Sequence, residues 1–182
     1  IFKREGMAGI ESIADIFSEK HFEVPTTEEL MSLQERKISR FKEYNVQVFN
    51  EMPGILSFLR ERGSGIGLVT GSLRRSVEHV LDTRLISYFD TIVTVDDVER
   101  GKPNPDPYLT ALRLLGANPE ETMVIENAPM GIKSAKAAGL HCVAVETTLP
   151  SPYLDEADVI VKNHSELIGF IQGACSPCGV SA

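Results

Sequence analysis

Residues 123–139 read MVIENAPMGIKSAKAAG, and this stretch decides the fold that the sequence predicts. An apolar run ends in a carboxylate, Glu126, and an amide, Asn127. A turn at Pro129 and a helix of small residues follow, and Gly139 ends that helix. A buried strand that leads through a short turn into a helix is the repeating unit of parallel α/β sheets. The polar pair at the strand end is therefore either the end of a structural element or half of a metal site.

The alternation of strands and helices continues on both sides of this stretch. The strands are continuous apolar runs, which is typical of a parallel sheet with helices on both faces. We expect a Rossmann-like, three-layer α/β core with the carboxyl ends of its strands, and any site, at one edge of the sheet. Ser72 and Asp106 are expected to cap two of the helices. The sequence predicts strands over 65–71, 91–95, 122–127, 141–146 and 158–162, and helices over 53–62, 72–81, 106–116 and from Ser165.

The first 50 residues follow a helical pattern instead. Thr26 and Glu29 have the spacing of a capping box that opens a helix. We expect a small helical cap domain over 1–50, a hydrolase-like core over 51–172 and a disordered tail over 173–182. The first residues read as the end of an element, so the cap is expected to be incomplete. Apolar residues recur along the predicted cap helix at mostly helical spacing: Leu30, Leu33, Ile38, Phe41, Tyr44 and Val48.

Composition argues against several classes of function. The 182 residues have a net charge of −8 with both signs scattered, which disfavours nucleic acid or an anionic membrane as a partner. No apolar run approaches the roughly 20 residues of a membrane span, and no signal-peptide pattern opens the chain. Cys142, Cys175 and Cys178 make no disulfide framework, so we expect a cytoplasmic protein.

Polar residues follow several of the predicted strands and would meet at the site edge. Thr70 ends a strand, and Gly71 and Ser72 open a helix. The hydroxyl and the free N–H groups of the helix start could bind an anion, or Ser72 could simply cap the helix. Lys102 lies in a proline-stiffened loop, either as a fixed cation for phosphate or as an ordinary exposed lysine. Glu126 and Asn127 offer side-chain oxygens, which are the ligands that Mg²⁺ prefers. The alternative is that the Asn127 amide only stabilises the turn before Pro129.

The order and spacing of these groups resemble the haloacid dehalogenase superfamily, and within it the beta-phosphoglucomutase-like group of phosphatases and phosphomutases. GKPNPDPYL (101–109) and IENAPMGIKSAKAAG (125–139) are the most specific parts, and the resemblance covers nearly the whole chain. It implies a Mg²⁺-dependent phosphatase that acts on a small phosphorylated metabolite, such as a sugar phosphate.

The resemblance also implies roles for matching residues. Asn127 stands where many members carry an aspartate, so we expect weaker Mg²⁺ binding than in those members. The implied roles are phosphate binding for Thr70, Gly71, Ser72 and Lys102, catalysis for Thr70 and Lys102, and metal binding, directly or through water, for Glu126 and Asn127.

The nucleophile of the family has no match in this sequence. The family uses an aspartate in an Asp-x-Asp-Gly pattern, and neither Asp15 nor the pair Asp96-Asp97 fits it. In the family this strand lies between those predicted here over 65–71 and 122–127. We expect it upstream of this chain, and expect the 182 residues alone to fold poorly, with an unpaired gap in the sheet, and to be inactive.

The cap also departs from the pattern of the sugar-phosphate mutases, which grip a second phosphate with an arginine. Gly9 stands at that position, and Arg4 and Arg74 are the substitutes we consider. A phosphatase is therefore favoured over a phosphomutase. A third reading is a non-catalytic scaffold that binds phosphate or a partner.

Other classes have weaker support. A zinc or redox module at Cys175 and Cys178 lacks a second ligand pair. Dinucleotide-binding enzymes need a glycine motif after a strand, whereas GSGIGL (63–68) precedes one. Phosphate-loop NTPases need a Ser or Thr after Gly-Lys, whereas Pro103 follows Gly101-Lys102 here.

Overall fold

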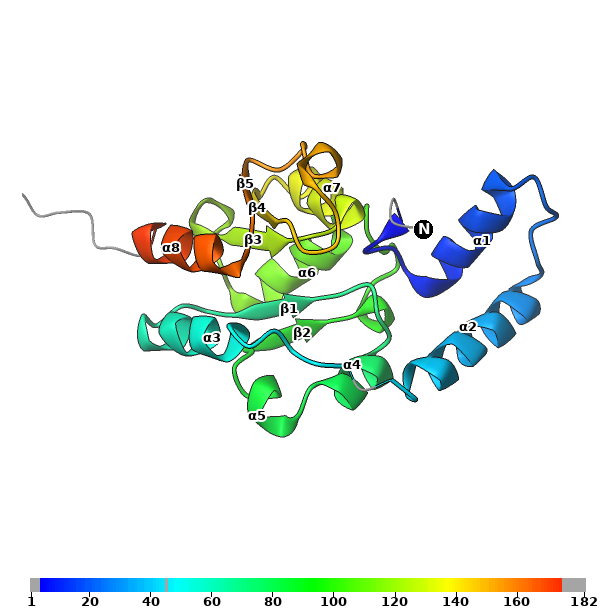
Figure 1. Ribbon diagram of the computed structural model, residues 1–182, viewed down its shortest axis with the longest axis horizontal. Coiled ribbons are helices and arrows are strands. Elements are labelled where there is room, and N and C mark those ends of the chain that lie inside the picture. The colour runs from blue at the N-terminus through cyan, green and yellow to red at the C-terminus, as the bar shows by residue number, and fades with distance from the viewer. Residues whose placement is uncertain (1–3, 45, 175–182) are drawn as a thin grey trace, which may run out of the picture.

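The core contains parallel strands with helices on both sides, as the alternation in the sequence predicts (Figure 1). The computed structural model describes residues 4–44 and 46–174. Within them the strands are β1 (Gly67–Val69), β2 (Thr91–Val93), β3 (Met123–Glu126), β4 (His141–Val145) and β5 (Val159–Val161). The core helices are α3 (Met52–Glu61), α4 (Arg74–Val80), α5 (Thr83–Ile86), α6 (Asp106–Leu115), α7 (Pro129–Ala137) and α8 (His164–Ala174). Single 3-10 turns lie at Val95–Asp97, Pro119–Glu121 and Ser151–Tyr153.

The strands form two parallel sheets. β1 pairs with β2, and β4 lies between β3 and β5. Within the described residues, β1 and β3 therefore each have one edge without a strand partner. Val69 of β1 nevertheless packs against the hydrophobic cluster that contains Val124 of β3. This strand order agrees with the expected gap between these two strands.

The side chains of β4 explain the three layers. Because successive residues of a strand point to opposite faces, Cys142 and Ala144 join a cluster with Leu112 of α6 on one face. Val143 and Val145 join a second cluster with residues of α3 and α8 on the other face. These four residues of β4 are buried, and only His141 at its start is exposed, which explains why the strand reads as an apolar run.

The cap lobe consists of α1 (Gly9–Glu19) and α2 (Thr27–Phe41), which pack against each other beside the core (Figure 1). The predicted capping box is present, because the Glu29 N–H donates to Thr26 Oγ1 at 3.3 Å and the Thr26 N–H donates to Glu29 Oε2 at 2.8 Å. The division into a cap over 1–50 and a core over 51–172 stays a prediction. The predicted tail beyond Ala174, with Cys175 and Cys178, lies outside the described residues.

The end of the cap helix differs from the prediction. α2 ends at Phe41, so Tyr44 and Val48 do not lie on it. The Tyr44 N–H bonds to the Phe41 carbonyl, three residues back, which closes a turn in place of another helical turn. The side chain of Tyr44 is 70% exposed, whereas Leu30 and Ile38, on the predicted apolar stripe, are buried.

Two predicted helix caps are also wrong. α4 begins at Arg74 with Leu73 as its N-cap, and the Ser72 N–H instead donates to Thr70 Oγ1 at 3.1 Å in the turn before the helix. α6 begins at Asp106, whose carboxylate makes no capping bond because it pairs with Arg100 at 3.1 Å. In one case a local turn, and in the other an ion pair, replaced the capping interaction.

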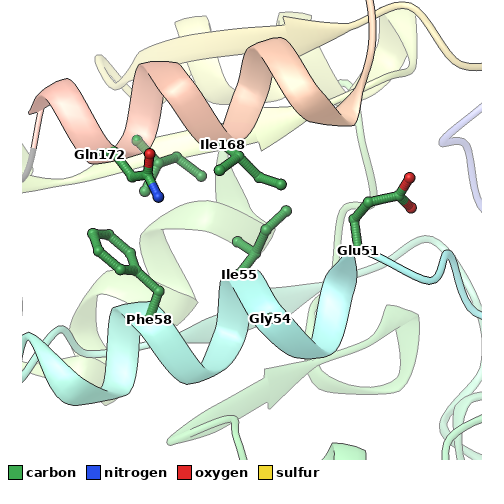
Figure 2. A pocket seen from close by; sticks show the side chains of 7 residues that line it. Glu51, Gly54, Ile55, Phe58, Ile168 and Gln172 are labelled. Carbon is green, nitrogen blue, oxygen red and sulfur yellow. The ribbon is translucent and has the colours of Figure 1, made fainter.

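An apolar groove of about 230 Å³ lies between α3 and α8. Figure 2 shows Ile55 and Ile168 facing each other across it, with Glu51 at one end and Phe58 and Gln172 at the other. Within the described residues, the groove is lined by α3 and α8 and by Glu51 directly before α3, and no residue from the strand ends lines it. No helix within the described residues is both long and apolar enough to cross a membrane.

Replacing the cap residue Thr26→Ala should destabilise the protein by about 1 kcal/mol, because the Glu29 N–H loses its acceptor. Urea denaturation measures this loss, and amide exchange should quicken first in the opening turn of α2. Thr27→Ala is the matched control, since Thr27 is the first helical residue and not the cap. Equal effects of the two substitutions would contradict the assigned cap.

Candidate active site

The carboxyl ends of β1 and β3 meet at Lys102. Lys102 lies in the loop before α6 and is only 3% exposed. Its Nζ donates to the Val69 carbonyl oxygen at 3.1 Å and to Glu126 Oε1 at 2.5 Å. The lysine thus joins the ends of two strands that do not pair with each other. The alternative reading of Lys102 as an ordinary exposed side chain is wrong.

Glu126 has a donor at every lone-pair position. Its Oε1 accepts from Lys102 and from the Tyr108 hydroxyl at 2.7 Å, while its Oε2 accepts from the N–H groups of Asn127 at 3.0 Å and Ala128 at 3.2 Å. A carboxylate offers about four such positions. A metal bound directly to Glu126, or a metal-bound water that donates to it, would therefore displace one of these donors.

Tyr108 supports both charged groups. It projects from α6, is buried, and has Lys102 Nζ 4.9 Å from the centre of its ring. Burial raises the pKa of the Tyr108 phenol well above its ordinary value, and the negative charge of Glu126 raises that pKa further. The phenol consequently stays protonated and remains a donor to the carboxylate.

Gly131 allows α7 to pass directly over the Glu126 carboxylate. A Cβ atom at this position would overlap the carboxylate carbon and both of its oxygens. Real Cβ atoms do not approach so closely, so any side chain would push the helix or the ion pair aside. The glycine five residues after Glu126 in the sequence is therefore required by the buried carboxylate.

Thr70, Gly71 and Ser72, three of the predicted phosphate-binding residues, lie together after β1. The Thr70 N–H still bonds to the Val93 carbonyl of β2 at 2.9 Å, so Thr70 extends the sheet by one residue. A Cβ atom at Gly71 would lie 2.5 Å from the Gly6 carbonyl oxygen, so only glycine fits beside this cap segment. Ser72 follows in the turn. Because α4 starts later than expected, the cradle consists of a turn and not of a helix end.

Asn127 lies on the same edge and contacts two other segments. Its Nδ2 donates to Thr147 Oγ1 at 2.9 Å, after β4, and lies 3.4 Å from Glu5 Oε1 on the cap side. The amide therefore faces the ends of two neighbouring strands and the start of the described chain. This position is consistent with either a metal-ligating role or a turn-supporting role.

The three residues considered for binding a second phosphate do not gather at the strand ends. They are Arg4, Gly9 and Arg74. Arg4 pairs with Asp15 and Glu19 of α1. Arg74 donates to the Ile92 carbonyl at 2.8 Å and to Asp97 at 2.7 Å. Gly9 starts α1, where a Cβ atom would meet the Gln34 side chain of α2.

The side chains around Asn127 offer only part of a site for a divalent cation. Among the described residues no three His, Cys, Asp or Glu side chains cluster closely enough to hold a metal. The Asn127 amide oxygen is a ligand of the kind that Mg²⁺ prefers, and Mg²⁺ commonly keeps several waters, whereas the Glu126 oxygens already accept four hydrogen bonds. The residues present therefore fit part of a magnesium site.

Sequence reasoning missed Tyr108 and Glu5, and it gave no reason for Gly131. A tyrosine on the sheet-facing side of an apolar helix was a usable signal, since a buried hydroxyl needs a partner. A glycine inside a helix was another, because it usually has a packing reason. Nothing in the sequence around Glu5 indicated that it would reach the strand ends.

Comparison with known proteins gives the arrangement a family context. The family model of haloacid dehalogenase-like hydrolases matches residues 3–145. Beta-phosphoglucomutase from Clostridium difficile has a similar fold, with a TM-score of 0.78 at 22% identity over 93% of this chain and 78% of that chain.

Several related enzymes are phosphatases by name. Validoxylamine A 7′-phosphate phosphatase of Streptomyces hygroscopicus subsp. limoneus is 40% identical over 114 residues, but this match spans 62% of the present chain and only 54% of that enzyme. Hexitol phosphatase A of Escherichia coli K12 is 28% identical over 91% of the chain and 81% of its own length. Pyrophosphatase PpaX of Bacillus mycoides is 33% identical over 75% of the chain and 69% of its own length.

Gly131→Ala should destabilise the protein by about 3 kcal/mol, because the added methyl group displaces the Glu126 carboxylate or the helix that covers it. Chemical denaturation measures the change. Gly169→Ala in α8 is the matched control, since nothing lies within 4 Å of a Cβ atom there. That control should be neutral or stabilising by about 0.5–1 kcal/mol. A loss of similar size in both variants would contradict the close approach at Gly131.

Proposed function

The chain belongs to the haloacid dehalogenase-like hydrolase family, and from that premise we propose that it is a Mg²⁺-dependent phosphatase acting on a small phosphorylated metabolite. The phosphatase names of the relatives support the proposal. A cytoplasmic location belongs to the same proposal. The chain spans about half (54%) of the length of validoxylamine A 7′-phosphate phosphatase, so the activity of the whole protein is part of this proposal.

Lys102 is the observation that carries the proposal. Phosphoryl transfer depends on neutralising charge and on positioning, and a buried ammonium at the ends of two strands supplies both. Of its three N–H donors, two are used by the Val69 carbonyl and Glu126 within the described residues. We propose that the third donates to a phosphoryl oxygen.

The remaining roles follow from the same edge of the sheet. In the proposal, the Thr70 hydroxyl and the Gly71 N–H bind the phosphoryl oxygens, with Ser72 beside them in the turn. In the same proposal Asn127 and Glu126 hold Mg²⁺, and a contact of Glu126 with the metal, directly or through water, replaces one of its four present donors. When bound, the cation would neutralise further phosphoryl charge.

The nucleophile is proposed to come from a strand that precedes this sequence. The support is the split sheet, because β1 and β3 have unpaired edges while Lys102 joins their carboxyl ends. A parallel strand between them would end beside Lys102. The isolated 182 residues should then release no phosphate, whereas the protein with its preceding residues should.

The ion pairs of Arg4 and Arg74 favour a phosphatase over a phosphomutase. A mutase must hold a second phosphate, and it needs a cation for that purpose. Arg4 and Arg74 are both engaged with carboxylates, and Gly9 has no side chain to offer. A hexitol phosphate and pyrophosphate are the two substrate types that the relatives' names suggest.

Phosphate release from a panel of sugar phosphates, hexitol phosphates and pyrophosphate, with and without Mg²⁺, tests the proposal in the full protein. Lys102→Met should lower kcat/KM by about 100- to 1,000-fold, because one preorganised cation is lost. Lys133→Met is the control, since Lys133 makes only a surface ion pair at 3.5 Å with Glu156. A full protein that binds these compounds without turnover would instead be the non-catalytic scaffold.

Asn127→Asp should tighten Mg²⁺ binding by about tenfold, because added ligand charge raises cation affinity. Isothermal calorimetry with Mg²⁺ alone measures this change without requiring turnover. Thr147→Val, which removes only the hydroxyl partner of Asn127, should change the affinity little. An unchanged affinity in Asn127→Asp would rule out coordination at this residue.

A further inference from the structure

The cap segment 5–7 lies over the candidate active site. On one side, the Gly6 carbonyl oxygen lies 2.5 Å from where a Cβ atom of Gly71 would be. On the other side, a Cβ atom at Gly6 would lie 3.2 Å from the Gly131 nitrogen and 3.4 Å from Ala128 Cβ. The backbone of this segment therefore runs between the turn after β1 and the start of α7. Segment 5–7 is therefore a direct neighbour of the residues proposed to bind the phosphoryl group.

The side chain of Glu5 is only partly satisfied there. Its Oε1 lies 3.4 Å from Asn127 Nδ2, which is long for a hydrogen bond. Its Oε2 is buried and has no hydrogen-bond partner among the described residues. A buried carboxylate oxygen without a donor is costly, so the position favours a ligand that brings a donor.

The cations closest to this segment in the sequence and in the site are already paired. Arg4 binds Asp15 at 2.5 Å and also Glu19, and Lys102 binds Glu126 at 2.5 Å. Neither therefore neutralises Glu5. Within the described residues Glu5 has no ion-pair partner.

We propose that Glu5 sets the substrate class, because its carboxylate accepts a hydrogen bond from a hydroxyl group of a polyol phosphate and repels the second anionic group of pyrophosphate. The inference rests on the proposed function and narrows it. The phosphoryl group occupies the cradle of Thr70, Gly71 and Lys102, so Glu5 meets the leaving group. A hydroxyl-rich leaving group supplies the missing donor, whereas an anionic one adds like-charge repulsion.

Steady-state kinetics of the full protein with a hexitol phosphate and with pyrophosphate test this inference. Glu5→Gln keeps the size of the side chain and removes its charge. We expect kcat/KM for the hexitol phosphate to fall about three- to tenfold, and kcat/KM for pyrophosphate to rise about threefold. Glu28→Gln removes the same charge from the exposed first turn of α2 and should change neither value.

A second variant separates charge from reach. Glu5→Asp keeps the charge but withdraws it by one methylene group, so it should lose the hydroxyl contact and still disfavour pyrophosphate. An unchanged ratio of the two kcat/KM values in both variants would overturn the inference, as would an equal decline for both substrates. Circular dichroism confirms that each variant is folded before the ratio is interpreted.

Two further outcomes are distinguishable. Calorimetry with Mg²⁺ alone should give the same affinity in Glu5→Gln as in the unsubstituted protein, and a clear weakening would assign Glu5 to the metal instead. If the full protein hydrolyses neither substrate, the proposed function fails and this inference fails with it. If it hydrolyses both, and the variants leave the ratio unchanged, only the inference about Glu5 fails.

Discussion

The buried ion pair between Lys102 and Glu126 is the interaction on which the rest of the site depends. Removing two charges from water is expensive, and their attraction repays that cost only when every remaining donor and acceptor is satisfied. Here the carboxylate also accepts from Tyr108 and from two backbone N–H groups, and the ammonium also donates to the Val69 carbonyl. These partners come from β1, α6 and the turn after β3, so one polar cluster fixes the relative positions of three elements.

The same cluster constrains the sequence around it. α7 must pass close to the carboxylate, which excludes a side chain at Gly131, and the helix continues with small residues that pack on the sheet. Ser134 donates to the Asn104 carbonyl at 2.5 Å and so holds the Lys102 loop against α7. On the cap side, a Cβ atom at Gly101 would lie 3.6 Å from Ala8. The loop that carries the lysine is thus held by α7 and lies close to the start of α1.

The placement of charge decides what this edge of the sheet can bind. Arg4, Arg74 and Lys102 all have carboxylate partners, and of these three only Lys102 lies between the strand ends. A phosphoryl group would therefore meet one preorganised cation and backbone N–H groups, and not a broad basic surface. Preorganised donors of this kind favour developing negative charge without a cost of reorganisation. The inference about Glu5 adds a place for hydrogen-donating groups, because its Oε2 has no partner within the described residues.

The sequence by itself determined the local elements and the identity of the strand-end residues. Continuous apolar runs predicted parallel strands, the pair Thr26 and Glu29 predicted a helix start, and Gly139, with its positive φ of 75°, marked a helix end. These features depend on neighbours along the chain, so a local pattern can reveal them. Only the tertiary structure decided that Lys102 is buried against Glu126, that Tyr108 completes the pair, and that Glu5 reaches Asn127 from 122 positions away. Such contacts follow from how distant elements pack, and long-range packing leaves no periodic signal in the sequence. The mistaken caps at Ser72 and Asp106 have a different origin, because the competing partners, Thr70 and Arg100, lie only two and six residues away in the sequence.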